Sequence, residues 1–370
     1  MVKRAAALFL VCVSLATWVG CGPTSSNYMY VAIPGSNEIV VYREDPNSGI
    51  LTQLVGSPIL AGLAVQALVI HPSGKFLYAA NSGEGDVSLF NISSGGGLTE
   101  NPPRTNVGNA PTLIAMDAAG TFLYVGNSGS NDISVFSISA SNGALTPVLQ
   151  TSGQTAPIGL SPINMEVSPS GGVLYVTGAV SIGGTSQGII EAFSLTQGVL
   201  SVLPTSPYST GINPYGLAIT PKGGFLYTAN NIDDSISEFT INAAGNAAGS
   251  PPGSLAPLAN SPFGQPYAGP QALQIDKSGT YLYVANQAST SVAGYSIGSD
   301  GALTGLTTNP FDTGSGPSVL ANDKAGKYLF VGNQKSPAIQ SFSLDTGSGT
   351  LTSVATYTLP GTPTSIAITP

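Results

Sequence analysis

The feature that most constrains this chain is a sevenfold internal repeat, each copy centred on an aromatic residue in a short apolar run such as KFLYAAN or TFLYVGN. Successive centres are 48, 46, 51, 52, 56 and 47 residues apart. They are Tyr30, Tyr78, Tyr124, Tyr175, Tyr227, Tyr283 and Phe330. Such a period is typical of propeller blades, each a four-stranded antiparallel sheet. The repeat therefore predicts one seven-bladed domain, where 370 residues would otherwise suggest two or three.

Each unit divides into four predicted strands. An inner strand such as PTLIAMD is followed by a turn, the aromatic strand, an alternating strand such as DISVFSIS, and a last strand opened by Gly-x-Leu-Thr or Gly-x-Leu-Ser. The unit after Asn242 blurs that last signature. Only 8% of the residues are charged, Gly and Pro are abundant, and no long segment shows helical spacing of apolar residues. The predicted fold class is all-β.

The two ends of the repeat region complete each other. The chain enters the first unit directly at an aromatic strand near Tyr28, and it finishes with PTSIAITP, which matches an inner strand without the rest of its unit. Pairing of the C-terminal strand with the N-terminal blade would close the ring and remove an exposed sheet edge. Residues 28–370 are therefore expected to form one seven-bladed β-propeller.

The first 20 residues have the pattern of a signal peptide, with Lys3 and Arg4 before an apolar stretch too short to span a bilayer in the usual way. The segment TWVGCG resembles a lipobox and predicts lipidation at Cys21, with residues 21–27 as a short tether. An ordinary signal peptide or an uncleaved anchor is the alternative. We expect an exported protein, anchored by lipid alone in the periplasm or at the surface, on the outer membrane if the source is Gram-negative.

Charge and motif content exclude several function classes. Loss of Lys3 and Arg4 with the signal would change the net charge from −8 to −10, so nucleic acid is an unexpected partner. Scarce Lys and Arg also disfavour phosphorylated ligands. There is no P-loop, dinucleotide fingerprint, nucleophile motif or Cys/His metal site, so no metal and no cofactor are predicted. A monomer is expected.

The repeat pattern resembles the lactonase-type seven-bladed propeller family, which includes 6-phosphogluconolactonases and carboxymuconate cyclases. The segment HPSGKFLYAANSGEGDVSLFNISSGGGLT, residues 71–99, carries the resemblance most clearly, and the similarity extends over all seven units. The resemblance implies the fold and suggests lactone hydrolysis. It does not fix the activity, because one fold supports many functions.

Residues that recur in every unit are more often structural than functional. His71, the only histidine, falls in a turn slot that other units fill with short side chains: Asp117, Ser168, Thr220, Asp276, Asp323 and Thr369. We therefore interpret His71 as a turn residue on the face opposite the ligand cleft. The same reasoning applies to the asparagines that end the aromatic strands: Asn81, Asn127, Asn230, Asn286 and Asn333.

Functional residues are better sought where one unit departs from the others. Glu166 is the only carboxylate within an inner strand, at a position where other units have Val69, Ala115, Ala218, Ala321 and Ala367. It should line the central channel or be paired locally, and it is the one weak candidate for catalysis. The predicted ligand-binding residues are Asn164, Glu166, Tyr215, Gln271, Gln274 and Asn322.

The loops after the aromatic strands and those that enter the inner strands should share one face of the propeller. Acidic residues collect there: Glu38, Glu84, Asp86, Asp132, Asp233 and Asp234. With Tyr215 and Gln271 they would suit a sugar or a cation better than an anion, unless they form only a solvated rim.

Two functions remain open. The first is a binding or interaction module for a small molecule, a carbohydrate or a protein partner. The alternative is an exported hydrolase for an unphosphorylated sugar lactone. A convergent acid or base set around Glu166 would favour the enzyme.

Overall fold

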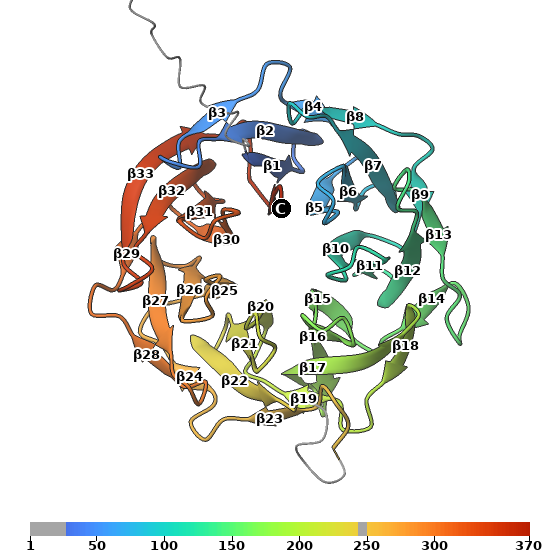
Figure 1. The fold of residues 1–370 in the computed structure, drawn as a ribbon. Helices are drawn as coiled ribbons and strands as arrows, with labels where there is room; N and C mark the ends of the chain where they lie inside the picture. The colour runs from blue at the N-terminus through green and yellow to red at the C-terminus, as the bar shows by residue number, and fades with distance from the viewer. Residues whose placement is uncertain (1–26, 243–249) are drawn as a thin grey trace, which may run out of the picture.

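The computed structural model describes residues 27–242 and 250–370, and these residues form seven antiparallel sheets arranged around a central axis. Figure 1 shows the sheets as the blades of a closed ring. The all-β class and the seven-bladed propeller are confirmed. The predicted signal peptide, Cys21 and most of the tether lie outside the described residues. The described residues contain no helix of the length and apolarity needed to cross a membrane.

The inner strands all run in one direction along the axis, and they define two ends of the channel. We call the end where these strands begin the entry end and the end where they finish the exit end. Most begin at or next to a proline, and a register shift follows it. They are β5 (Val65–Ile70), β10 (Pro111–Met116), β15 (Ser161–Val167), β20 (Pro214–Ile219), β25 (Pro270–Ile275), β30 (Pro317–Asn322) and β34 (Ser365–Ile368).

The second strand of each sheet carries the repeated aromatic residue and forms the core. The side chains of Tyr78 and Phe330 are fully buried, which is worth about 1.5–3 kcal/mol for each large apolar side chain. The first of these strands includes Asn27, which we had assigned to the tether. The set is β1 (Asn27–Ile33), β6 (Phe76–Asn81), β11 (Phe122–Asn127), β16 (Val173–Ile182), β21 (Phe225–Asn230), β26 (Tyr281–Asn286) and β31 (Tyr328–Asn333).

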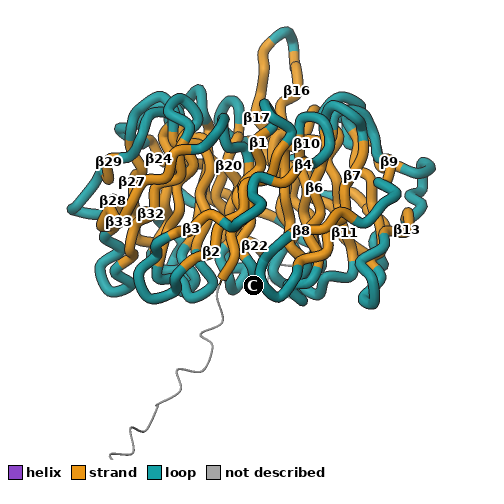
Figure 2. The backbone as a smooth tube through the Cα atoms, turned by 90° about the horizontal axis from the view of Figure 1, so that it is seen from above, coloured by secondary structure: helices purple, strands orange, loops and turns teal. Residues whose placement is uncertain are grey.

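The third strands pair with the second strands through tight turns at the entry end. One hairpin, formed by β16 and β17, is longer than the others and projects from this end of the propeller (Figure 2). The third strands are β2 (Glu38–Glu44), β7 (Asp86–Ile92), β12 (Asp132–Ile138), β17 (Thr185–Thr196), β22 (Ser235–Ile241), β27 (Ser291–Ile297) and β32 (Ala338–Leu344).

The outer edge differs in detail from the predicted single fourth strand. In six sheets, two short segments pair with different parts of the third strand, whereas β33 (Leu351–Thr358) spans the full length. The first segments are β3 (Leu51–Gln53), β8 (Leu98–Glu100), β13 (Leu145–Pro147), β18 (Val199–Val202), β23 (Leu255–Pro257) and β28 (Leu303–Gly305). The second are β4 (Ile59–Leu60), β9 (Thr105–Asn106), β14 (Thr155–Pro157), β19 (Tyr208–Ser209), β24 (Phe263–Gly264) and β29 (Phe311–Asp312).

The Gly-x-Leu signature is explained by contacts between neighbouring sheets. Gly301 has φ +88°, and a Cβ there would lie 2.4 Å from the Phe225 ring of the preceding sheet, so only glycine fits. Its carbonyl also accepts a hydrogen bond of 2.7 Å from the Tyr227 hydroxyl. Gly253 plays the same part in the unit whose signature was blurred, with a bond of 2.8 Å from Tyr175. The repeat thus encodes the seams between blades as well as the strands.

The ring closes through the first and last strands, as predicted. β34 pairs with β1, placing Met29 opposite Ile368 and Ala32 opposite Ser365. The Thr369 hydroxyl accepts a hydrogen bond of 2.9 Å from the Tyr28 N–H. Both ends of the described fold therefore lie at the exit end of the channel (Figure 2).

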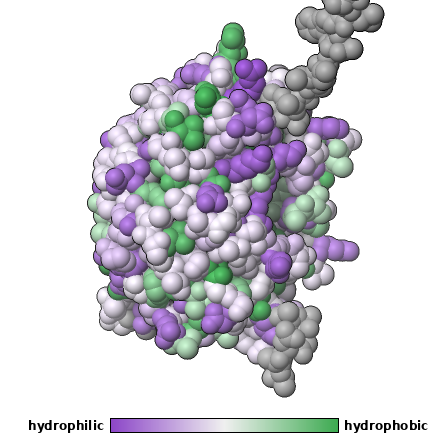
Figure 3. Space-filling view, turned by 60° about the vertical axis from the view of Figure 1, so that its left-hand side comes forward, coloured by the Kyte–Doolittle hydropathy of each residue, from purple (hydrophilic) through white to green (hydrophobic). Residues whose placement is uncertain are grey.

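One side of the outer surface shows little apolar area in one place. On the side shown in Figure 3, hydrophobic side chains occur in small groups separated by weakly and strongly polar ones. This side corresponds to the outer strands at the left of Figure 1, around β27 to β33.

Candidate functional site in the central channel

Glu166 and Gln274 occupy the same structural position in two inner strands. Glu166 pairs with Tyr175 and Gln274 pairs with Tyr283, just as Ala218 pairs with Tyr227 in the strand between them. The other five sheets place Val69, Ala115, Ala218, Ala321 and Ala367 at this level. Glu166 and Gln274, which depart from the repeat in the sequence, are therefore two polar side chains at one level of the channel.

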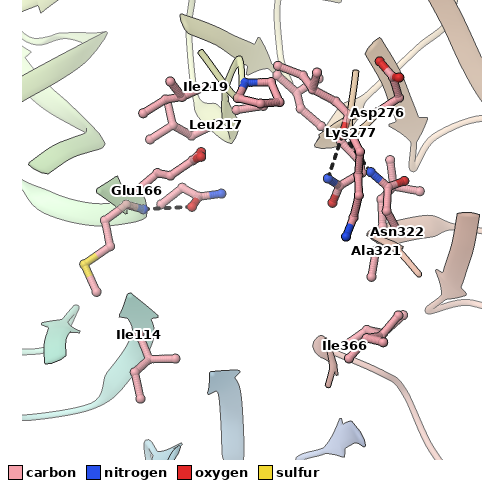
Figure 4. A pocket seen from close by; sticks show the side chains of 18 residues that line it. Ile114, Glu166, Leu217, Ile219, Asp276, Lys277, Ala321, Asn322 and Ile366 are labelled. Atoms are coloured by element: carbon pink, nitrogen blue, oxygen red, sulfur yellow. Dashed lines mark hydrogen bonds between the residues drawn. The ribbon is translucent and has the colours of Figure 1, made fainter. Parts of the chain in front are cut away.

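A cavity of about 650 Å³ occupies the part of the channel nearer the exit end. Its walls come from β10, β15, β20, β25, β30 and β34, and it reaches the turns that follow β20 and β25 through Pro221, Asp276 and Lys277. Figure 4 shows Glu166 and Asn322 on opposite sides of this space, with aliphatic residues such as Ile114 and Ile366 between them. The cavity contains four of the six predicted ligand-binding residues: Asn164, Glu166, Gln274 and Asn322.

The carboxyl group of Glu166 has few polar neighbours. Its side chain extends towards Leu217 and Ile219 of the adjacent strand (Figure 4). Burial raises the pKa of Glu166 to about 8, although a hydrogen bond from the Ile219 N–H acts in the opposite direction. The channel alternative for Glu166 is therefore supported. A carboxyl with this pKa is largely protonated at neutral pH and can donate a hydrogen bond.

Three of these four lining residues carry amide groups, and the protein itself engages each of them. The Asn164 Nδ2 donates to the Tyr215 carbonyl at 2.8 Å, and its Oδ1 accepts the Met165 N–H at 2.8 Å. The Asn322 Nδ2 donates to the Ile275 carbonyl at 2.7 Å, and its Oδ1 is buried without a partner. Both side chains connect neighbouring inner strands. Gln274 is engaged as well, since its Nε2 donates to the Ile275 carbonyl at 3.1 Å. The three amides shape the cavity, and Glu166 is the better ligand contact.

Tyr215 and Gln271 lie elsewhere. Both follow the proline that begins their inner strand, so they lie at the entry end, and neither lines the cavity. Tyr215 is 37% exposed. The six predicted residues therefore divide between the entry end and the cavity, because the alternation of a strand decides which side a residue faces but not its depth along the channel.

Carboxylates at the entry end bind other groups of the fold. Glu84 accepts the Leu63 N–H at 3.0 Å and pairs with Arg104, which also pairs with Glu100 at 2.6 Å. Asp233 accepts the Ile212 N–H, and Asp234 accepts the Gly269 N–H at 2.7 Å. These contacts hold the loops at the starts of the inner strands. They support the rim interpretation of the acidic residues over a ligand site.

The turn slot is structural, as the repeat alignment predicted. Asp276 accepts the Thr280 and Tyr281 N–H groups, each at 2.7 Å, so its carboxylate is occupied although it lines the cavity. His71 lies in the equivalent turn, bonded through Nδ1 to Ser73 and through Nε2 to the Gly120 carbonyl. It does not line the cavity. However, the cavity extends to the same end as His71, so the expected separation onto opposite faces is wrong.

The asparagines that end the second strands are also structural. Asn81 is fully buried and donates to Asp86 at 2.7 Å and to Ser88 at 3.0 Å in the next strand. Asn127 makes the matching pair of bonds with its own third strand. Their amides fix the hairpin at the entry end, away from the cavity.

Lys277 is a lining residue that the sequence analysis missed. It follows the turn-slot residue Asp276, and its Nζ donates to the Lys324 carbonyl of the neighbouring turn. The charged side chains among the lining residues are therefore Glu166, Asp276 and Lys277. The signal was a lysine directly after a turn slot, but turn lysines are common and only the closed ring brings this one to the channel.

The sequence matches the family model described as lactonase, seven-bladed β-propeller, over residues 23–161 and 253–368. These ranges cover more than half of the chain. The chain belongs to the lactonase seven-bladed β-propeller family. The break between the two matched ranges includes Glu166 and most of the sheets around β15–β18 and β20–β22, whereas the lining residues Gln274 and Asn322 lie within the second matched range.

Solved structures with the same fold confirm the architecture. A Bacteroides fragilis protein assigned as a 6-phosphogluconolactonase is 21% identical, with a TM-score of 0.76, and the match covers 93% of this chain and 98% of that one. The periplasmic gluconolactonase of Pseudomonas aeruginosa is 20% identical, with a TM-score of 0.76 and 94% and 99% coverage. A Lactobacillus plantarum protein is 18% identical, with a TM-score of 0.71 and 93% and 99% coverage. Identities this low establish the fold and not the activity.

No protein of curated function matches the sequence significantly. Within residues 27–242 and 250–370, no group of three or more His, Cys, Asp or Glu side chains is placed to hold a metal ion. The chemistry of the site must therefore be argued from the cavity itself.

Proposed function

We propose that this lactonase-family propeller binds an unphosphorylated, hydroxyl-bearing lactone in the channel cavity and hydrolyses it there. The observation that carries the proposal is Glu166, a carboxyl with a pKa of about 8 that faces a cavity of about 650 Å³ in a lactonase-family fold. Most pockets of this size hold small ligands and present a few placed polar groups. The similarity to a gluconolactonase and a 6-phosphogluconolactonase assignment supports the choice of ring chemistry.

The charge around the cavity favours an unphosphorylated ligand. Lys277 is the one cation among the lining residues, Asp276 lies beside it, and no arginine reaches the cavity wall. Phosphate sites usually combine several cationic or backbone N–H donors aimed at one point. A neutral ring with hydroxyl groups places no such demand on this site.

The proposed reaction is simple ester hydrolysis. Water adds to the lactone carbonyl carbon, the bond from that carbon to the ring oxygen breaks, and the ring oxygen keeps one proton as a hydroxyl. The other product group is a carboxylic acid, which releases its proton to solvent at neutral pH. The cavity would contribute by orienting the ring and by stabilising the charge that develops on the carbonyl oxygen.

A pH-stat assay with D-glucono-δ-lactone tests the proposal, because each turnover releases one proton. We expect the purified protein to accelerate hydrolysis above the spontaneous rate near pH 6, and to prefer this lactone to 6-phosphogluconolactone. Glu166→Leu should remove the acceleration, and His71→Ser should retain it as the matched control. No acceleration by folded wild-type protein would contradict hydrolysis.

One observation favours the binding-module function as a second candidate. The lining carboxyl groups are those of Glu166 and Asp276, and Asp276 is held by N–H groups of its own turn, so the described walls hold no obvious second acid or base. A binding protein needs only a shaped polar surface. Calorimetry separates the two functions: lactone binding without acceleration of hydrolysis would identify a binding protein, with a small molecule or carbohydrate as its ligand.

We also propose that the protein is exported and anchored by a lipid on Cys21. The support is the sequence pattern of residues 1–21. Cys21→Ser should move the protein from the membrane fraction to the soluble fraction after lysis without detergent. Unchanged detergent dependence in this variant would contradict the anchor.

A further inference from the structure

Glu166 lies among aliphatic side chains and has no cation of the described chain beside it, which is unusual for a carboxyl group that would act as a base. The neighbouring strand contributes Leu217 and Ile219, and the lining residues of β10, β30 and β34 are uncharged. Within the described residues, the ion pairs are those of Arg104 with Glu84 and Glu100, so Glu166 has no cationic partner. A carboxylate left without a cation among aliphatic side chains is costly, and the neutral acid is the favoured form.

The two other charged groups of the cavity do not change this balance. The Asp276 carboxylate is held by N–H groups of its own turn, and the Lys277 ammonium is held by the Lys324 carbonyl. Both come from the end of β25, and β20 contributes only aliphatic side chains and the Ile219 N–H. Nothing that lines the cavity is placed to draw the proton from Glu166.

We propose that Glu166 acts in this site as an uncharged hydrogen-bond donor, whose O–H binds the carbonyl oxygen of the lactone, so that the site selects its ligand by an acceptor oxygen. This inference rests on the proposed function and gives Glu166 a different role from a general base. A donor aimed at that oxygen would stabilise the negative charge that forms there as water adds to the carbonyl carbon. The raised pKa of Glu166, about 8, agrees with this role.

The role predicts a definite pH dependence. Below about pH 8 the carboxyl keeps its proton and donates, and above it the carboxylate repels the ligand oxygen. Binding should therefore be constant on the acid side and weaken through about pH 8. A general base would show the opposite, with activity rising as the proton is lost.

Two unreactive probes distinguish the contribution of the carbonyl to binding from that of the rest of the ring. Gluconolactam keeps the hydroxyls and a ring carbonyl, whereas anhydroglucitol keeps the hydroxyls and lacks the carbonyl. Calorimetry on the full folded protein should show at least tenfold tighter binding of the lactam. Glu166→Gln keeps an uncharged donor, so it should bind the lactam within a few-fold of wild type at acid pH and lose the pH dependence. Glu166→Leu should lose tenfold or more.

The outcomes distinguish this inference from the proposed function. If wild type binds the lactam and hydrolyses the lactone, but Glu166→Gln is as impaired as Glu166→Leu, the donor role is overturned and the function stands. If wild type binds neither probe, both fail. Infrared spectroscopy provides a measurement without ligand: the protonated carboxyl absorption at neutral pH should be weaker in Glu166→Gln than in wild type, and the difference spectrum should show the band of Glu166. A band unchanged by the substitution would also overturn the assignment.

Discussion

Two seams of the ring, both between adjacent blades, are built differently. At the seam between the sheets of β20–β23 and β25–β28, the Tyr227 hydroxyl donates to the Gly301 carbonyl and the Glu238 carboxyl accepts the Leu303 N–H. At the closing seam, between the sheet of β30–β33 and the first sheet, Phe330 has no hydroxyl to donate. The Leu51 N–H there donates to Tyr357 instead.

The closing seam also holds a poorly satisfied acid. Glu44 is 1% exposed, one of its oxygens accepts from Asn27 at 3.2 Å, and the other has no partner. Burial and the nearby Asp323 charge raise the pKa of Glu44 to about 7. The comparison indicates that the side-chain bonds of Tyr227 and Glu238 join the sheets of β20–β23 and β25–β28, whereas that of Tyr357 joins the sheets at the closing seam, where the pairing of β34 with β1 completes the first sheet.

Loss of the closing strand should have the largest effect. Removal of residues 361–370 eliminates β34, leaves the backbone groups of β1 unpaired and opens the ring. Because net stability is typically about 5–15 kcal/mol, we expect misfolding or aggregation. Soluble yield and thermal melting are the measurements, and removal of the exposed Pro370 alone is the control. A truncated protein that melts within a few degrees of wild type would refute this closure.

The acid at the closing seam should make stability depend on pH. The pKa of Glu44 is raised to about 7, so its contribution is complete in acid and is lost as pH rises through about 7. Each unit of pKa shift corresponds to about 1.4 kcal/mol of unfolding free energy. Wild type should therefore lose roughly 1–3 kcal/mol of stability from acid to alkaline pH that Glu44→Gln does not lose.

Hydrogen exchange should locate this effect. In wild type, the amides of β1 and β34 should exchange faster as pH rises, after correction for intrinsic rates, and Glu44→Gln should suppress the change. Glu238→Gln is the matched control. The pKa of Glu238 is also raised to about 7, but Glu238 lies at the seam between the sheets of β20–β23 and β25–β28. Equal effects of the two variants on β1 and β34 would remove the distinction between the seams.

His71 occupies the turn slot that Thr369 occupies elsewhere in the ring. Its substitution tests whether this position is structural or belongs to the ligand site. His71→Ser loses the bond to the Gly120 carbonyl and an edge contact with Phe76, at a cost of about 1–2 kcal/mol. Any turnover should be retained, because His71 does not line the cavity. A large loss of turnover in a folded variant would show that the turn assignment is incomplete.

The smallest effect should come from exchanging the seam hydroxyl. Tyr227→Phe removes the donor to Gly301 and should cost about 0.5–1.5 kcal/mol. At the closing seam, Phe330→Tyr offers a hydroxyl to the equivalent glycine, Gly49. This variant should be more stable than wild type by part of that amount. Urea unfolding measures both. A gain in Tyr227→Phe would show that these bonds do not hold the seams.

Much of the fold could be predicted because the repeat presents each structural demand several times. A Gly at the start of the outer strand is required by a positive φ and by the ring packed against it. The amides of Asn81, Asn127 and Asn230 bond the next strand, whereas Asn286 donates to Val284 of its own strand. The search for departures from the repeat also found Glu166 and Gln274 in this way. The same search could not show that Asn164 and Asn322 are occupied by neighbouring strands, because those bonds cross between units.

The sequence by itself determined the number of blades, the first three strands of each blade and the way the ring closes, since these follow from local periodicity and from matching ends. The tertiary structure alone decided which end of the channel holds the cavity, placed Lys277 beside it and buried Glu166, which raises the pKa of that carboxyl. The physical reason is that depth along the channel and burial depend on side chains from six inner strands at once, and no single unit of the repeat contains that information.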